Sequence, residues 1–318
     1  MNNYFEKIPL AVINFITVLS GVLTIITSIL SILAFFKFES FKLGWACISF
    51  ILFLFSLVLF VRMRKYRMLA NMRIEKTSEN YKQMLHSIKD LYFEVLHSYK
   101  TNGLSTSSLN SICESKLKSI LANLCETFYA FTNKPVSACI KLVCYSITDE
   151  NEDVTVDDVK LITFCRSPNS SSERGAYENG NSKPIWLKEN TDFLEIISDE
   201  NFRDYFYQKN LPEYVKKLQT EHKTYKNSNP NWENDYKATI VVPIKIEFSK
   251  LYHLNGDDSF HTLGFLCIDS QHTDAFTEKQ EKYNVDLARS YAEIIYLVLS
   301  KYKYYLYKIK EKKGLLKV

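Results

Sequence analysis

The chain has 318 residues, enough for one soluble domain of ordinary size together with additional helices. Its 40 basic and 36 acidic residues nearly cancel, so the net charge of +4 gives no indication of direct nucleic-acid binding. The seven cysteines form no tight framework and mostly stand among apolar residues. They exclude a small disulfide scaffold and favour buried, reduced thiols in a reducing compartment.

Two long apolar runs, 8–36 and 43–61, contain no Asp, Glu, Lys, Arg or His. A helix needs about 20 apolar residues to cross a bilayer core, whereas the apolar region of a signal peptide has only about 7–15. The runs therefore predict a two-helix transmembrane hairpin over residues 1–61. Basic residues follow the second run directly, at 62, 64, 65, 67 and 73. The positive-inside rule then predicts a multi-pass protein of the cell inner membrane, with the N-terminus and the soluble part in the cytoplasm.

Small and polar residues follow one line along the first predicted membrane helix, at spacings of three and four. The members of this stripe are Asn14, Thr17, Gly21, Thr24, Ser28 and Ser31. Small residues let membrane helices approach closely and hydroxyls bond across the contact, which is typical of a packing seam against the second helix or another subunit. In a second interpretation, several copies of the stripe line a polar path through an oligomer.

Residues 62–103 comprise a basic juxtamembrane segment and a long predicted helix. The apolar residues between 74 and 95 again step by three and four, which fits either a short coiled coil or an amphipathic helix packed on its own domain. Thr101-Asn102-Gly103 ends this helix, and the serines after position 104 cap the next one.

The remaining soluble part alternates strands with helices and polar loops. Strand patterns cover 137–147, 156–165, 237–248 and 261–269, and the first two form a hairpin. Helical stretches are expected around 193–197, 202–208 and 214–218, and a long helix follows Phe276. The fold class is therefore α+β, with a domain over 104–300 built on a central antiparallel sheet flanked by helices, and a basic Tyr/Lys-rich tail over 301–318.

This order resembles a GAF domain over roughly residues 109–300: an opening helix, two strands, a variable middle part, two strands and a closing helix. Residues 236–244, YKATIVVPI, resemble the family's penultimate strand with its Val-Pro-Ile triplet. Gly264 precedes an apolar run that ends in Asp269, as in the final strand, and Phe276-Thr277 resembles the start of the closing helix. The Asn-Lys, Phe and Asp-Glu signature of cyclic-nucleotide-binding members is incomplete, because Gln280-Glu281 stands where the acidic pair is expected.

The resemblance implies a small-ligand pocket between the sheet and the variable helices. The candidate ligand-binding residues are Arg166, Trp186, Arg203 and Tyr236. In the alternative interpretation, the two aromatic residues belong to the core and the two arginines are solvated surface charges.

No catalytic constellation stands out. The sequence has no phosphate-binding Gly-rich loop and no His-Glu-x-x-His helix. Cys139 and Cys144 are five apart in a strand pattern, so they face opposite sides and do not share a metal. We therefore expect no enzyme, no cofactor and no metal site.

A sensor domain without catalytic output must pass its signal to a partner or to its own membrane segment. The sequence predicts a homo-oligomeric, membrane-bound cytoplasmic sensor of a small, nucleotide-like molecule, whose two-helix module acts on the lipid bilayer as a ligand-gated pore or a membrane-disrupting effector. Membrane effectors of bacterial nucleotide-signalled antiviral systems have a similar arrangement. The alternative is a membrane-tethered adaptor whose GAF-like domain binds a partner protein and whose hairpin is only an anchor.

Overall fold

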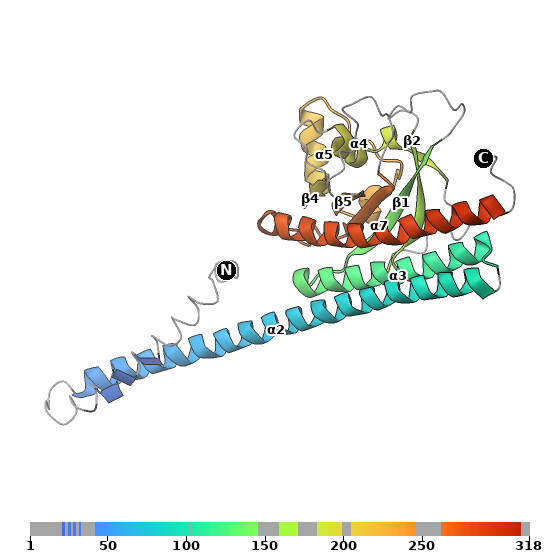
Figure 1. Cartoon of the computed structure of the whole chain (residues 1–318). Helices are drawn as coiled ribbons and strands as arrows, with labels where there is room; N and C mark the ends of the chain where they lie inside the picture. Colours follow the sequence, from blue (N-terminus) through green and yellow to red (C-terminus); the bar gives the residue numbers. More distant parts are fainter. Residues whose placement is uncertain are drawn as a thin grey trace, which may run out of the picture. The chain divides into compact units, whose positions relative to one another are not determined.

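A computed structural model of the chain describes residues 42–101, 103–145, 159–170, 183–198, 205–245 and 262–312, with short stretches between 21 and 32. The chain divides into two compact units, Met1–Glu75 and Lys76–Val318 (Figure 1). Of the stripe residues, Gly21 and Ser28 occupy helical positions, while Asn14, Thr17, Thr24 and Ser31 lie outside the described residues.

The helix α2 (Lys42–Thr101) is 60 residues long and joins the second apolar run to the segment after it without interruption. In the first unit most of its described apolar side chains between Ile48 and Val61 are exposed, and Leu59 is half-buried. Within the part of the chain that the structure describes, no helix is both long enough and apolar enough for a membrane span.

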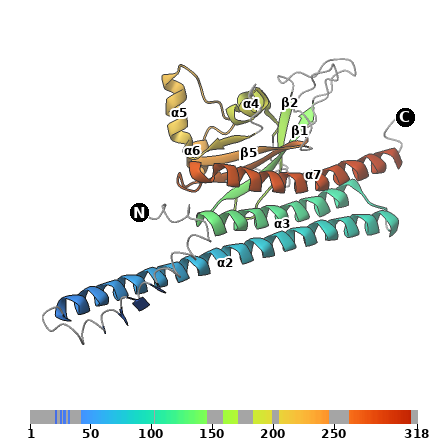
Figure 2. The ribbon, with the colours of Figure 1, turned by 60° about the vertical axis from the view of Figure 1, so that its left-hand side comes forward.

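The second unit contains a six-stranded sheet in the order β3-β2-β1-β6-β5-β4. The strands are β1 (Ser137–Tyr145), β2 (Val159–Arg166), β3 (Ile185–Trp186), β4 (Phe206–Gln208), β5 (Ala238–Ile244) and β6 (Gly264–Ser270). Every neighbouring pair is antiparallel. The α+β class with a central antiparallel sheet flanked by helices is therefore confirmed (Figure 2).

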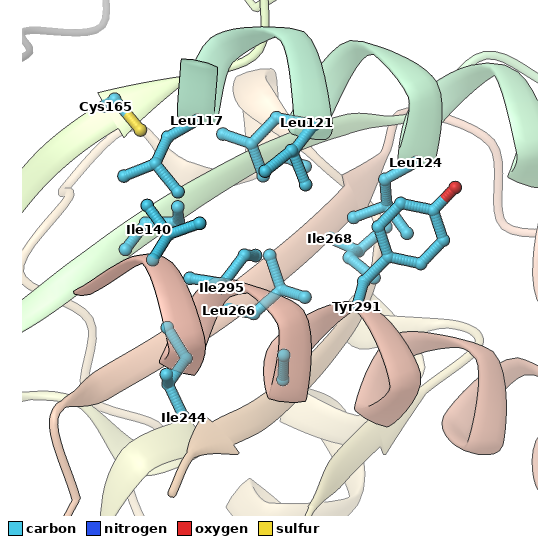
Figure 3. Packing of buried hydrophobic residues seen from close by; sticks show 14 of the residues in the cluster. Leu117, Leu121, Leu124, Ile140, Cys165, Ile244, Leu266, Ile268, Tyr291 and Ile295 are labelled. Carbon is cyan, nitrogen blue, oxygen red and sulfur yellow. The ribbon is translucent and has the colours of Figure 1, made fainter. Parts of the chain in front are cut away.

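One face of the sheet is covered by α3 (Thr106–Thr132) and α7 (Glu281–Lys312). Their apolar side chains form one buried cluster with alternate residues of the central strands, among them Ile140, Leu266 and Ile268 (Figure 3). α3 begins as the serine cluster predicts, since the side chain of Ser105 accepts a hydrogen bond from the amide of Ser108. α7 extends through most of the predicted tail, and Ile309 is buried in the same cluster.

The part of α2 in the second unit packs on the helical layer of its own domain. Met84, Leu91 and Val95, all members of the three-and-four pattern, are at most 3% exposed and belong to the same cluster. A buried polar contact reinforces the packing: the amide of Asn80 donates to the hydroxyl of Thr127 at 3.0 Å, and the hydroxyls of Thr127 and Tyr291 lie 3.1 Å apart. These bonds link α2, α3 and α7 through groups that water cannot reach.

The opposite face carries a second cluster, built by η4 (Leu187–Glu189), α4 (Thr191–Ser198), α5 (Leu211–Thr220) and α6 (Trp232–Asp235). The helix expected around 202–208 is wrong for its second half, because Phe206–Gln208 forms β4 and pairs with β5. Phe206 is buried against the sheet and the aromatic pair Phe206-Tyr207 suits a strand, so sheet pairing prevails over the apparent helical pattern.

Gly264 marks a close approach between β6 and β1. It lies opposite Leu142, and an added Cβ would overlap the carbonyl oxygen of Lys141 and stand 3.0 Å from the Cα of Leu142. Gly103, in contrast, is required by its backbone conformation, with φ at +70° and open space around it. η5 (Glu278–Gln280) then leads into α7.

Candidate functional site

A cavity of about 490 Å³ lies on the sheet face opposite α3 and α7. Its floor is made by side chains of β1, β2 and β6, and its walls by α4, α6 and the segment before α6. The residues that line it include Cys139, Lys141, Thr163, Arg166, Lys183, Asn190, Asp192, Phe193, Asn227, Asn229, Asp235, Tyr236, Cys267 and Asp269.

The strand register assembles the floor from residues that are distant in sequence. Arg166, Cys139 and Cys267 stand side by side across β2, β1 and β6, and Lys141 pairs with Thr163 in the neighbouring row. Because side chains alternate along a strand, these residues face the cavity, while Ile140, Leu266 and Ile268 face the helical layer. The register between β1 and β2 shifts by one residue after Ile140. Because of this shift, Thr163 pairs with Lys141 and faces the cavity, although it stands three residues before Arg166.

Two buried carboxyl groups face the cavity. Asp192, 7% exposed at the start of α4, accepts a hydrogen bond from the amide of Phe193 at 3.2 Å. Burial raises the pKa of Asp192 to about 7, outweighing the attraction of Lys141. Asp269 accepts a hydrogen bond of 2.8 Å from the hydroxyl of Thr239 on the neighbouring strand. The cavity therefore contains a carboxyl group that changes its charge near neutral pH.

Asn190 holds the outer wall in place. Its side-chain oxygen accepts hydrogen bonds from the amide and the hydroxyl of Ser228, at 3.0 and 2.9 Å, and its side-chain nitrogen donates to the carbonyl of Trp186 at 2.8 Å. Thr191 adds two bonds with the backbone of Lys226. This polar latch ties the Asn-rich segment 227–234 to the start of α4.

Within the wall, asparagine side chains organise the segment itself. Asn227 donates to the hydroxyl of Tyr236, and Asn229 donates to the carboxylate of Asp235 at 2.6 Å. Burial raises the pKa of Tyr236 well above its ordinary value, so its hydroxyl stays protonated. The wall thus offers the amide groups of Asn227 and Asn229 and the hydroxyl of Tyr236 as neutral hydrogen-bonding groups, beside the carboxylate of Asp235.

The lining suits a small polar molecule that carries donors, acceptors and charge. Lys141, Arg166 and Lys183 supply positive charge, and the carboxyl groups of Asp192, Asp235 and Asp269 supply hydrogen-bond acceptors. Phe193 and Tyr236 add aromatic surface. Among the described residues, no group of three or more His, Cys, Asp or Glu is placed to hold a metal ion.

Two of the four ligand residues predicted from the sequence line the cavity. Arg166 and Tyr236 both line the cavity. Trp186 does not, although its neighbour Ile185 does, and the ammonium of Lys160 lies 4.1 Å from the Trp186 ring centroid. Arg203 lies outside the described residues. Sequence reasoning missed Lys141, Asp192 and Asn190; the one available signal was the run of asparagines between 227 and 234.

Comparisons with known proteins give structural neighbours only. No protein-family profile matches the sequence, and no curated protein does either. A type II free methionine-R-sulfoxide reductase from Thermoplasma acidophilum shares 13% identity over 60% of this chain and 96% of its own, with a TM-score of 0.34. The GAF domain of an Acinetobacter phosphoenolpyruvate-protein phosphotransferase shares 12% identity over 68% and 94%, with a TM-score of 0.33. A free methionine-R-sulfoxide reductase of Staphylococcus aureus, in complex with its substrate, shares 14% identity over 62% and 97%, with a TM-score of 0.29.

Proposed function

We propose that the second unit is a non-catalytic, GAF-like sensor domain that binds a small, nucleotide-like molecule in the cavity between its sheet and α4. The observation that supports this proposal is the cavity of about 490 Å³, with buried carboxyls on one side and Arg166 at the end of β2. Carboxyl groups bind the ring N–H donors of a heterocycle, and a guanidinium binds an anionic group in two-point contact.

The output in this proposal is the N-terminal membrane module. Its support is the pair of apolar runs, 8–36 and 43–61, and the exposed apolar side chains of α2 between Ile48 and Val61, which a bilayer would cover. Assembled copies in the inner membrane, with the sensor domain in the cytoplasm, would act as a ligand-gated pore or a membrane-disrupting effector. Nucleotide-signalled antiviral defence is the setting that we propose for such an effector.

A specific surface favours the second candidate, a membrane-tethered adaptor. On the outer side of α2, Leu85 and Phe93 are 59% and 69% exposed, although they belong to the soluble unit. Exposed apolar side chains on one helix face are typical of a protein-binding surface. In this alternative the cavity-bearing domain recruits a partner protein and the hairpin only anchors it.

The two candidates separate in a membrane-potential assay. Cells that express the full chain are given a panel of cyclic mono- and dinucleotides, and depolarisation is followed with a potential-sensitive dye. The sensor proposal expects one compound to depolarise the cells. It also expects Arg166→Ala to abolish this response and Lys188→Ala, a cation outside the cavity lining, to leave it unchanged.

A second variant tests the stripe. Replacing Asn14, Thr17 and Thr24 by Leu together should remove the response if the stripe is the conducting path. If depolarisation survives this change, the stripe is a packing seam. If no compound depolarises the cells and a partner protein co-purifies only with an intact Leu85 and Phe93 surface, the adaptor is the correct function.

A further inference from the structure

Two thiols stand opposite each other on the floor of the cavity. Cys139 of β1 and Cys267 of β6 are register partners of an antiparallel pair, and both line the cavity. Directly opposed residues in such a pair have Cα atoms about 4.5–5.5 Å apart, within the range of about 4.4–6.8 Å that a disulfide spans. Both cysteines are free thiols.

These thiols are buried in the apolar cluster below the cavity, at 2% and 4% exposure, but they differ from the cysteines of α3 in having charged neighbours. Cys113 and Cys125 lie in α3 within the apolar core, where burial raises the pKa of each thiol to about 12. The pKa of Cys139 is instead lowered, to about 6, because the Cys267 thiol donates a hydrogen bond to its sulfur and because Arg166 and Lys141 lie nearby. The hydrogen bond to Cys139, and then burial, raise the pKa of Cys267.

We propose that Cys139 and Cys267 are a peroxide-oxidisable pair that closes to a disulfide across β1 and β6 on the cavity floor. The assignment goes beyond ligand sensing and does not depend on it. Both residues line the cavity and are only 2% and 4% exposed, so hydrogen peroxide would have to reach the sulfurs from the cavity. Arg166 on the neighbouring strand would stabilise a thiolate on Cys139.

The chemistry needs only the two thiols and one peroxide. The Cys139 thiolate attacks one peroxide oxygen, the O–O bond breaks, and hydroxide leaves, which gives a sulfenic acid. The Cys267 sulfur then attacks the sulfenic sulfur, the S–O bond breaks, and the S–S bond forms as water leaves. The proton of the Cys267 thiol leaves with the hydroxyl group as water, and the hydroxide from the first step takes up the proton that Cys139 released on ionisation. Two electrons thus pass from the two thiols to peroxide, which is reduced to two water molecules.

The full chain in detergent micelles, exposed to hydrogen peroxide and quenched with N-ethylmaleimide, tests the proposal by peptide mapping. We expect a peptide pair joined through Cys139 and Cys267, lighter by two hydrogen atoms and separated again by dithiothreitol. Cys139 should be consumed at least about tenfold faster than Cys113. If both cavity cysteines stay open to alkylation after peroxide, or if Cys139 is linked elsewhere, the proposal is wrong.

Single variants assign the order of the steps. In Cys267→Ser, the sulfenic acid on Cys139 should accumulate and be trapped by dimedone, whereas Cys139→Ser should give no dimedone adduct on Cys267. Cys113→Ser is the matched control and should behave as the unmodified chain. A dimedone adduct on Cys139 that is equally strong with and without Cys267 would contradict the role of Cys267. The map of the unmodified chain decides the disulfide itself, independently of how the variants fold.

Discussion

Replacing Asp192 by asparagine isolates the effect of one buried carboxyl group on the stability of the domain. The asparagine side chain keeps the oxygen that accepts the amide hydrogen of Phe193, and it has nearly the same volume as aspartate. It cannot ionise. The variant therefore removes a titration from the start of α4 while it preserves the hydrogen bond to the helix backbone.

The size of the effect follows from the pKa of Asp192 in the two states. Burial raises the pKa to about 7 in the folded domain, whereas an exposed Asp in the unfolded chain has a value of about 3.9. Between these values the folded state holds a proton that the unfolded state has released, so stability falls as pH rises. The slope is about 1.4 kcal/mol per pH unit, and the loss from about pH 5 to about pH 8 is about 3 kcal/mol.

Urea unfolding of the full chain in detergent micelles, followed by tryptophan fluorescence, measures this difference, since Trp232 lies in the cluster beside the cavity. We expect the free energy of unfolding of the Asp192→Asn variant, relative to the unmodified chain, to increase by about 3 kcal/mol from about pH 5 to about pH 8. Above the folded pKa the difference should level off, because the carboxyl is then ionised in both states.

Asp274→Asn is the matched control. Asp274 is exposed and forms an ion pair of 2.9 Å with Lys134, and the hydrogen bond from Lys134 lowers its pKa. Its carboxyl is therefore ionised in both states above about pH 5, so the effect of this substitution should not depend on pH in that range. A pH-independent difference for Asp192→Asn as well would refute the conclusion that burial keeps this carboxyl protonated.

Three further substitutions test the packing around the cavity. Gly264→Ala should lower the free energy of unfolding by at least about 3 kcal/mol, because the new Cβ overlaps backbone atoms of β1. Gly103→Ala should lower it by only about 1 kcal/mol, because there is open space around this residue. Equal thermal midpoints for the two variants would contradict this reasoning. Thr127→Val should lower the free energy of unfolding by about 2 kcal/mol, because the buried side-chain amide of Asn80 loses the hydroxyl to which it donates. The rate of amide hydrogen exchange over residues 76–101 should rise. Tyr291→Phe, which keeps the Asn80 bond, should cost less, and the reverse order would contradict the assigned network. Asn190→Ala should increase the rate of amide hydrogen exchange over residues 225–236, because the two hydrogen bonds from Ser228 are lost. Asn231→Ala, at an exposed position, should leave this rate unchanged. An unchanged rate in Asn190→Ala would show that other contacts hold the wall.

The main elements were predictable from the sequence because their signals are local. Continuous runs of apolar and β-branched residues located β5 and β6 to within a few residues, and the serine cluster located the start of α3. The strand β4 was not predictable, since three residues are too few to show alternation and their pairing partners lie 31 to 35 residues further on. Its identity depends on contact with β5, which no local pattern reports.

The cavity was harder to predict for the same reason. Arg166 and Tyr236 could be proposed from the resemblance, because each lies at the end or beginning of a strand pattern. The pairing of Cys139 with Cys267, and the position of Lys141 beside Thr163, depend on strand register. Asp192 looked like an ordinary first-turn residue of a helix, and only the tertiary structure shows that it is buried.

The sheet gives the cavity a physical connection to the helices. Cys267 and Asp269 line the cavity, while Ile268 between them belongs to the cluster on the other face, where it lies near Tyr291 (Figure 3). The hydroxyl of Tyr291 contacts Thr127, which in turn holds Asn80 on α2. A displacement of β6 by a ligand would therefore reach α2 through buried side chains, because Ile268, Tyr291 and Thr127 are all fully buried. It would shift the position of α2 only as far as the ligand binds one arrangement of this network more tightly than another. If the proposed sensor function is correct, Thr127 is the buried contact through which a displacement of the sheet would be passed from Tyr291 to Asn80 on α2.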